Sequence, residues 1–506
     1  MYRSPTAEAE VAEELAAERA GLVPRYAAAL PGARAAVLSR LWRALAHEPL
    51  PWVAGRERTR DGLVLRLADG RRLHGPAADP YATAAYVTAV DLDGVPYEDP
   101  ARLTEALPAP HRAAFAAELG HSAASLALSR AAQPAHPEEW PEEDWQWEQR
   151  VVDGHPFHPN CRSRPGFSVA EQLAYAPEHR PLVGLGLLPV PAGECLVTGA
   201  WPDELRDGRR LLLPVHPWQA EHVLKRPCDD GALTAHPLMS LRTLAVPGGP
   251  HVKTALTARL TSSVRDISVP SIAASADLSA FAEALAARTD GLLRITRTLG
   301  AATAHSPDLA AVWREAPKRY AGPGEHVLPV AALPATGLSE RPAWLGDFTR
   351  LALTAGLRLL ELGVALEAHG QNLLVVLSAS GAPLRLVYRD LADIRVSPAR
   401  LARHGVRAAG LPGRILTDDP VALRRKLFGS LVAGALAGTA GSGAALRAAL
   451  ETAVRELPRT ADLAALCEEP LPAKALTLMR LSPATPGDQW AALPNPLVLE
   501  PGRSDQ

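Results

Sequence analysis

Cysteine is scarce in this sequence, and its spacing excludes two classes of small structural site. Four cysteines occur in 506 residues, and no two of them form a C-x-x-C pair. Zinc knuckles and disulfide frameworks need closely grouped cysteines, so neither is expected. The same scarcity fits a reducing compartment, and we expect a cytoplasmic protein.

The chain also lacks a long apolar run and an excess of either charge. Residues 1–20 are acidic and alternate alanine with glutamate, unlike a secretory signal. The most apolar window, residues 430–446, is too rich in small residues to span a bilayer, and we predict two close-packed helices there. With 53 Lys and Arg against 55 Asp and Glu, neither nucleic acid nor a membrane is expected as a partner.

Several common nucleotide-binding and catalytic motifs are absent. The sequence has no G-x-x-x-x-G-K-[ST] loop, no G-x-G-x-x-G after a predicted strand, and no G-x-S-x-G elbow. Any nucleotide site must therefore be built on another scaffold. Hydrophobic residues make up 47% of the chain, which is ample for two or three domains.

Hydrophobic patterns divide the chain into three regions. Residues 1–145 are predicted to be mostly helical, with one hairpin whose turn is Asp69-Gly70. Residues 146–305 contain short strand patterns separated by turns, which indicates a mixed region. Residues 306–506 are predicted to be helix-rich with one hairpin. The sequence therefore predicts an α+β protein of several domains.

The segment 351–393 predicts a helix, a loop and a hairpin. Leucines at helical spacing lead toward Gly370, where glycine can end the helix. A hairpin centred near Gly381 would place Asn372 opposite Asp390. An amide and a carboxylate side by side suit Mg²⁺ that is also held by nucleotide phosphates, in a layout similar to that of protein kinases. An ordinary surface hairpin is the alternative.

Three cations have spacings that antiparallel strands can bring together. Arg242, Lys253 and Arg265 are 11 and 12 residues apart, and a turn at 246–250 separates the first two. If one strand continues beyond Lys253, a single face would carry Lys253, Thr257, Arg259 and Thr261. Converging cations with hydroxyls beside them suit a triphosphate or a polycarboxylate, because arginine binds planar oxyanions through paired hydrogen bonds. A solvated edge strand is an equal alternative.

Three histidines lie on loops that proline stiffens. His155, His158 and His216 each precede a proline, which fixes the backbone and excludes a helix. Three histidines suggest zinc, but no cysteine or acidic ligand accompanies them at a usual spacing. The nearby Arg162 and Arg164 favour an anion-binding loop, with buried structural histidines as the alternative.

The order of these motifs resembles that of the NRPS-independent siderophore synthetases, the IucA/IucC family. The matching motifs cover residues 150–395 and read HPFHPNCRSRPGF, PVHPWQ, KTALTARLTSSVRDIS, and EAHGQN followed by RD. The resemblance implies a cupped hand with a thumb at 1–145, fingers at 146–305 and a palm at 306–506. The palm would hold a kinase-like helix–loop–hairpin core at 367–393. The resemblance also implies a homodimer.

The activity that the resemblance implies is ATP-dependent ligation. A carboxylic acid, such as citrate or a related polycarboxylate, attacks ATP to give an acyl-adenylate and pyrophosphate. An amine or alcohol then displaces AMP, and Mg²⁺ accompanies the nucleotide. Two alternatives remain, a kinase-like phosphotransferase acting on a small molecule and a non-catalytic family member that acts as a binding protein.

Carried over by motif position, the resemblance assigns three sets of residues. The catalytic set is Arg265, His369, His158 and Lys253. The set that binds nucleotide or carboxylate is Ser240, Arg242, Lys253, Thr261, Ser262, Arg265, His155, His158, Arg162, Arg164, Gln371 and Asn372. The Mg²⁺ set is Glu367, Asn372 and Asp390.

Two departures from the family pattern bear on the choice of acid. Arg162 stands where the family usually has lysine, so a bidentate fork replaces a point charge. The sequence VPSIAASADLS follows VRDIS, where the family often continues with an Asn-Gly-Pro segment.

Overall fold

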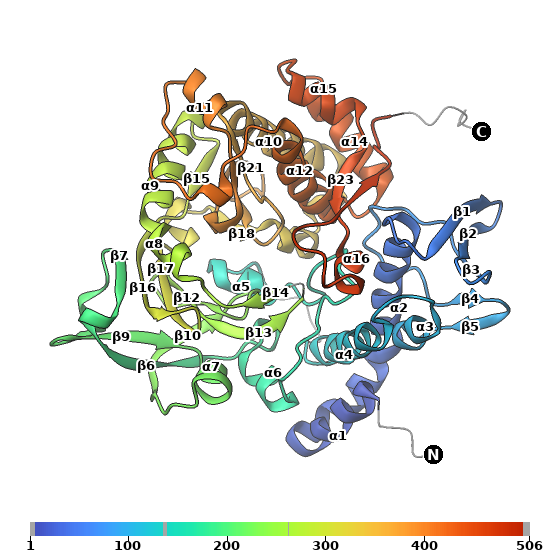
Figure 1. Ribbon diagram of the computed structural model, residues 1–506, viewed down its shortest axis with the longest axis horizontal. Helices are drawn as coiled ribbons and strands as arrows, with labels where there is room; N and C mark the ends of the chain where they lie inside the picture. The colour runs from blue at the N-terminus through green and yellow to red at the C-terminus, as the bar shows by residue number, and fades with distance from the viewer. Residues whose placement is uncertain (1–5, 135–138, 262, 499–506) are drawn as a thin grey trace.

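Helices and a meander of strands build the N-terminal core of the computed structural model, which describes residues 6–134, 139–261 and 263–498 (Figure 1). The helices are α1 (Ala7–Arg19), α2 (Val23–His47), α3 (Pro100–Ala106) and α4 (Arg112–Ala131). The strands, paired in chain order, are β1 (Val53–Thr59), β2 (Gly62–Leu67), β3 (Arg72–Gly75), β4 (Val90–Leu92) and β5 (Val95–Tyr97). The predicted turn at Asp69-Gly70 is confirmed between β2 and β3. The region contains more strand than its helical patterns indicated.

A long sheet forms the second core. Its strand order is β7-β16-β17-β12-β11-β10-β6-β9-β8. The strands are β6 (Val183–Pro191), β7 (Leu196–Gly199), β8 (Arg206–Asp207), β9 (Arg210–Val215), β10 (Asp229–Pro237), β11 (Thr243–Ala245), β12 (His251–Thr254), β16 (Thr298–Ser306) and β17 (Leu309–Arg314). A separate pair is made by β13 (Leu256–Leu260) and β14 (Ser263–Arg265). The helices of this region are α5 (Asp144–Gln149), α6 (Val169–Tyr175), α7 (Pro217–Gln219), α8 (Val269–Ala273) and α9 (Ser275–Ala286).

The third core packs helices on a smaller sheet of order β15-β21-β20-β18, in which β15 runs parallel to β21. These strands are β15 (Leu293–Ile295), β18 (His326–Pro329), β20 (Leu373–Leu377) and β21 (Pro383–Tyr388). The helices are α10 (Pro342–Leu362), α11 (Pro398–Arg403), α12 (Pro420–Leu427), α13 (Ala437–Ala440), α14 (Gly443–Val454) and α15 (Ala461–Glu468). A short pair, β19 (Val364–Ala365) and β22 (Arg395–Val396), lies beside them.

Helix α10 ends earlier than the sequence predicted. Its last residue is Leu362, and Gly363 follows with a left-handed φ of 108°. A Cβ at this glycine would lie 3.0 Å from the carbonyl oxygen of Ser397, so both the backbone angle and the space favour glycine. Gly370, the predicted end, instead belongs to the loop that precedes β20.

The C-terminal segment returns to the N-terminal core. β23 (Leu471–Lys474) and β24 (Trp490–Leu493) form a pair, and α16 (Leu476–Leu481) lies between them in sequence. Figure 1 shows α16 beside α4 and α2, and Leu478 and Leu481 are buried in the same core as Trp42. Residues from the two ends of the chain therefore share one core.

The apolar window at 430–446 is divided between two helical stretches that meet at an angle of 118°, Pro420–Ala440 and Gly443–Val454. This agrees with the predicted pair of helices, with the break at Gly441, whose φ is 75°. In the described residues no single helix has the length and apolar character to cross a membrane. The two helices of this bent pair are long and apolar enough only when they are taken together.

Candidate active site

The three predicted cations meet around Asp390, together with a fourth. Lys253 donates to Asp390 Oδ2 at 2.5 Å, and Arg242 donates to the backbone carbonyls of Arg265 and Asp266. Arg314 acts electrostatically on Asp390 as well. Four cations thus surround a single carboxylate, so the site carries an excess of positive charge.

Strand pairing accounts for this convergence. The turn at 246–250 folds β12 onto β11 with Thr243 opposite Lys253, as predicted, and β17 lies on the other side with Arg314 opposite His251. The predicted common face of Lys253 and Thr261 is wrong, because the strand breaks at Ala255 and the chain enters a different sheet.

Burial of these cations weakens their hold on protons. Desolvation lowers the pKa of Lys253 to about 8 and the pKa of Arg242 to about 10, although Asp390 opposes both shifts. Desolvation lowers the pKa of Arg265 and of Arg314 too. Burial alone would raise the pKa of Asp390, but the charges of Lys253 and Arg314 outweigh it and hold this pKa far below its usual range. Such a group of desolvated cations is stabilised by an added anion.

The predicted hydroxyl groups lie in tight turns. Ser240 Oγ donates to Thr243 Oγ1 at 2.9 Å and accepts from the backbone N–H of Thr243 at 3.1 Å, closing the turn before β11. Thr261 has a left-handed φ of 57° and lies between β13 and β14. The prediction for Ser262 falls outside the described residues.

Residues 154–168, which carry His155 and His158, form a loop without regular helix, as predicted, and are called the histidine loop. Arg265 of the cation cluster acts electrostatically on His158 of this loop. His158 is 1% exposed, and burial together with the charges of Arg480, Arg40 and Arg265 lowers its pKa to about 3. The pKa of His155 is also well below its usual range, through desolvation and the nearby His158. Both rings are therefore neutral at pH 7.

Hydrogen bonding identifies which ring nitrogen carries the proton. The Nδ1 atoms of His155 and His158 accept from the backbone N–H groups of Phe157 and Asn160, at 3.1 and 3.0 Å. Nδ1 of His369 accepts from the N–H of Gln371 at 3.3 Å. A neutral imidazole with an acceptor at Nδ1 carries its proton on Nε2. Each ring consequently offers one N–H donor to a ligand oxygen.

Arg162 and Arg164 contact a buried carboxylate, that of Glu178. Arg164 donates to Glu178 Oε1 at 2.7 Å, and Arg162 lies 3.5 Å from Glu178 Oε2. Arg162 also donates to the carbonyls of Val151 and Val152. Both arginines are at most 5% exposed, so they stabilise the loop from its buried side. The structure does not bring them into the cluster around Asp390, and their predicted role in binding nucleotide is not supported by this geometry.

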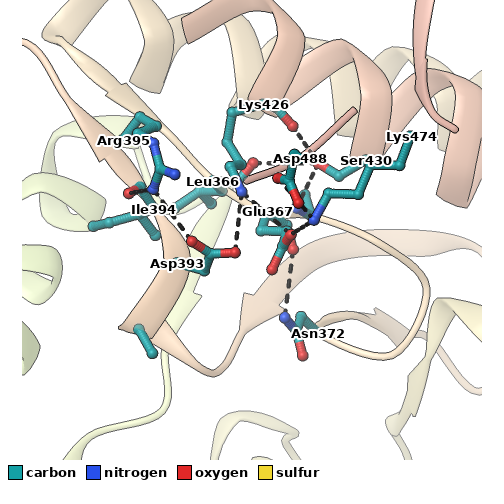
Figure 2. Close-up of polar contacts among 12 residues, drawn as sticks. Leu366, Glu367, Asn372, Asp393, Ile394, Arg395, Lys426, Ser430, Lys474 and Asp488 are labelled. Atoms are coloured by element: carbon teal, nitrogen blue, oxygen red, sulfur yellow. Dashed lines mark hydrogen bonds and ion pairs between the residues drawn. The ribbon is translucent and has the colours of Figure 1, made fainter. Parts of the chain in front are cut away.

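The loop that carries His369 is held by its own backbone. The N–H of Asn372 donates to the carbonyl of His369 at 2.9 Å, and its side-chain amide lies 3.5 Å from the carbonyl of Glu367 (Figure 2). Gln371 accepts through its carbonyl from the Arg389 guanidinium. Glu367 and Lys474 are among the charges that act on His369, whose pKa is lowered mainly by burial.

The hairpin register differs from the prediction by one residue. Leu373 pairs with Tyr388, so Asn372 lies opposite Arg389 and not opposite Asp390. Leu377 pairs with Pro383, so the turn is centred at Ser380, one residue before the predicted centre at Gly381. A bulge between Val376 and Leu377 then changes the register once more, and no local pattern marks it. Asp390 instead follows the strand with a left-handed φ of 71° and meets Lys253.

The donors predicted for Mg²⁺ do not form an open metal site. Glu367 Oε1 accepts from Lys426 at 3.2 Å and from Lys474 at 2.9 Å (Figure 2). Asp390 is paired with Lys253. Mg²⁺ favours oxygen ligands in near-octahedral geometry, but ammonium groups already occupy both carboxylates. The residues as arranged fit an anionic ligand better than a metal held by this set.

Sequence reasoning missed Arg314 and Lys474. Arg314 ends the apolar strand LAAVWR, where one terminal cation looks like a solvated strand end. Lys474 lies in the C-terminal segment, outside every motif and 107 residues from Glu367, and only the fold brings the two together. No local pattern marks either residue.

Two family models match the chain in succession. Residues 144–335 match the IucA / IucC family, and residues 342–488 match a family described as ferric iron reductase FhuF-like transporter. The first match contains the cations and the histidine loop, and the second contains His369 and Asp390. Residues 144–335 of this chain belong to the IucA / IucC family.

Curated relatives of this family match part of the chain. A citryl-spermidine/3,4-dihydroxybenzoyl-citryl-spermidine:spermidine ligase of Bacillus anthracis is 25% identical over 314 residues, which are 49% of this chain and 50% of the relative. An N(2)-citryl-N(6)-acetyl-N(6)-hydroxylysine synthase of Vibrio mimicus is 28% identical over 159 residues, 24% of this chain and 26% of the relative. The chain thus matches about half the length of its curated relatives, or less.

Solved structures of family members resemble the whole fold. The petrobactin biosynthesis protein AsbB of Bacillus anthracis has a TM-score of 0.75 at 18% identity, covering 98% of both chains. ATP-bound aerobactin synthetase IucA of Klebsiella pneumoniae has a TM-score of 0.72 at 20% identity, covering 92% of this chain and 99% of IucA. The mixed α/β multidomain fold of the IucA / IucC family is therefore present. The thumb, fingers and palm boundaries stay a prediction.

Proposed function

We propose that the protein is an ATP-dependent ligase that activates a polycarboxylic acid, such as citrate, as an acyl-adenylate and joins it to an amine or alcohol. AMP and pyrophosphate would be released. The observation that carries the proposal is the cluster of Arg242, Lys253, Arg265 and Arg314 around one carboxylate. The names of the relatives, which describe citryl-amine ligases and synthases, support the same chemistry.

The four cations suit the charge of this reaction. Attack of a carboxylate on the α-phosphate brings two anions together, and their repulsion is a large part of the barrier. Fixed cations in a desolvated site reduce that repulsion without reorganising during the reaction. Lys253 and Arg242 would hold phosphate oxygens, and Arg265, which responds to both Asp390 and Glu367, would lie between nucleotide and acid.

The neutral histidines suit a second requirement of this reaction, which is the orientation of the bound substrates. His158 and His369 each offer an Nε2–H, and Arg265 acts on both rings. A neutral N–H donor binds a carboxylate or phosphate oxygen without adding a charge. Because both pKa values are lowered, these rings stay neutral over the physiological range of pH.

Nucleotide analysis separates this proposal from a kinase-like phosphotransferase. The protein is incubated with ATP, citrate and hydroxylamine, and the nucleotide product is identified. We expect AMP, pyrophosphate and a hydroxamate. Accumulation of ADP without hydroxamate would favour the phosphotransferase, and no turnover with any acid in a broad panel would favour the non-catalytic alternative.

Arg265→Ala tests whether the cation cluster drives the reaction. Among the described residues the Arg265 guanidinium donates a single hydrogen bond, to the carbonyl of Leu260 at 3.2 Å, so the loss of this side chain should disturb the fold little. We expect pyrophosphate release to fall by roughly 10²–10³-fold, the effect of losing one donor to a developing charge. The thermal unfolding curve should be nearly unchanged. A wild-type rate would remove Arg265 from the mechanism.

A further inference from the structure

A second charged cluster centres on Glu367. Lys426 bridges Glu367 and Asp393, at 3.2 Å from each, and Lys474 bridges Glu367 and Asp488, at 2.9 and 3.2 Å (Figure 2). Figure 2 shows the two lysines approaching Glu367 from different elements. Lys426 comes from α12, and Lys474 ends β23. Glu367 is thus fixed from two sides.

Glu367 belongs to the loop that presents His369. The N–H of His369 donates to the carbonyl of Glu367 at 3.0 Å, and the N–H of Ala368 donates to Ser430 Oγ at 2.9 Å. Despite the effect of burial, Glu367 and Asp488 raise the pKa of Lys474, so this lysine keeps its charge at neutral pH. Lys474 therefore ties the His369 loop to the C-terminal segment.

The same segment reaches the other histidine loop. Arg480 of α16 donates through Nε to Glu118 Oε2 at 2.9 Å, and Asn160 donates to the same oxygen. The backbone N–H of Asn160 in turn donates to His158 Nδ1. After burial, the charge of Arg480 is the largest influence on the pKa of His158.

We propose that residues 471–481 form a positioning clamp, in which Lys474 holds the His369 loop and Arg480 holds the His158 loop. The His369 loop packs in the third core through Leu366 and Ala368. The His158 loop contributes Phe157 to that core and Cys161 to the N-terminal core, and few residues separate the two contacts of the clamp. The clamp therefore fixes the distance between two N–H donors that must bind one ligand. Its catalytic consequence rests on the proposed function, whereas its structural consequence does not.

Hydrogen–deuterium exchange of the full-length protein tests the clamp without any substrate. Lys474→Met should speed exchange several-fold in residues 366–372 and leave residues 155–161 unchanged. Arg480→Met should do the reverse. Arg350→Met and Lys318→Met are matched controls, because each removes a cation from a partly exposed ion pair elsewhere. Equal protection in all variants, or equal loss in both loops, would overturn the proposal.

Kinetics test the consequence for catalysis. Lys474→Met should lower kcat for pyrophosphate release by about tenfold, since misplaced groups cost rate, with the KM for ATP nearly unchanged. Lys474→Arg should restore most of the rate. In a His369→Ala background, Lys474→Met should have no further effect, because the lysine acts through the histidine. A persistent effect in that background would contradict the positioning role.

Two further variants and one control experiment keep the results separable. If Lys474→Met or Arg480→Met does not fold, Lys474→Gln and Glu118→Gln break the same contacts with smaller changes. If the wild-type protein releases no pyrophosphate with any acid, the proposed function fails, and hydrogen exchange still decides whether the clamp exists. If the wild-type protein is active but exchange does not respond, the clamp alone fails.

Discussion

At the scale of single residues, the site contains more positive than negative charge, and burying that charge costs free energy. Desolvation lowers the pKa of each of the four cations, so each is less stable as a cation than it would be in water. Asp390 compensates only one of these charges. A polyanionic ligand would supply the remaining compensation, which makes the site a strong candidate for ATP.

Arg314 is one of two residues whose role the sequence did not indicate. It is 8% exposed, and its guanidinium makes no hydrogen bond to the described residues, although Asp390 attracts it. Arg314→Met keeps most of the side-chain volume and removes the charge. We expect a loss of roughly 10²-fold in pyrophosphate release with little change in thermal unfolding. Arg297→Met, which removes an exposed arginine paired with Glu315, should keep the wild-type rate and serves as the control.

At the scale of elements, short segments matter more than the long helices. The histidine loop, the hairpin end and α16 carry the groups of the site, and buried ion pairs fasten them to one another. Arg389 at the hairpin end binds Glu148 of α5 at 2.6 Å, and Glu148 accepts from the N–H of Met239 at 2.9 Å. One carboxylate thereby connects the hairpin to the turn before Arg242.

The docking of α16 depends on Glu48. This carboxylate is 3% exposed and accepts from the backbone N–H groups of Thr477 and Leu478, at 3.1 and 2.7 Å. Glu48→Ala leaves both donors buried without partners, which costs about 1–3 kcal/mol. We expect faster hydrogen exchange in residues 476–481 and a lower melting temperature. Glu48→Gln keeps one acceptor and should show a smaller effect; equal effects would show that the hydrogen bonds are not what holds α16.

At the scale of the whole molecule, three large cores are joined by contacts between distant parts of the chain. Residues near the C-terminus complete the N-terminal core, and strand β15 pairs with β21 of the third core. Segments that are far apart in the sequence therefore pack against one another at these junctions. Buried ionisable groups at these junctions also make the stability depend on pH.

Acid is expected to destabilise the protein through its buried histidines. Burial lowers the pKa of both His158 and His216 to about 3, from 6.5. Their contribution to stability is complete above pH 6.5 and is lost as the pH falls, by about 1.4 kcal/mol per pH unit for each histidine. Glu48 opposes this trend, because burial raises its pKa from 4.5 to about 7 and its protonation stabilises the folded state at low pH.

His216→Asn isolates one of these contributions. Asparagine can still accept from the Trp218 N–H, as His216 Nδ1 does at 3.2 Å, but it cannot take up a proton. Denaturant unfolding at pH 6.5, 5.5 and 4.5 should show a shallower loss of stability in the variant, by about 1.4 kcal/mol per pH unit. Parallel curves for both proteins would mean that His216 becomes protonated without unfolding.

The sequence alone determined the features that depend on local chemistry. Proline kept the histidine loop from forming a helix, the turn at 246–250 paired two strands, and the spacing of Arg242, Lys253 and Arg265 indicated their convergence. The order of motifs was enough to indicate the family whose model matches residues 144–335. These inferences succeeded because turns and loops are encoded by the residues within them.

Only the tertiary structure decided which polar groups face the site and which face one another. A bulge placed Arg389 opposite Asn372, the buried Glu178 drew Arg162 and Arg164 away from the site, and two lysines occupied Glu367. For each of these charged groups, the partner lies outside the motif that carries the group. A buried charge must find its counter-charge wherever packing places it, and local patterns carry no record of that choice.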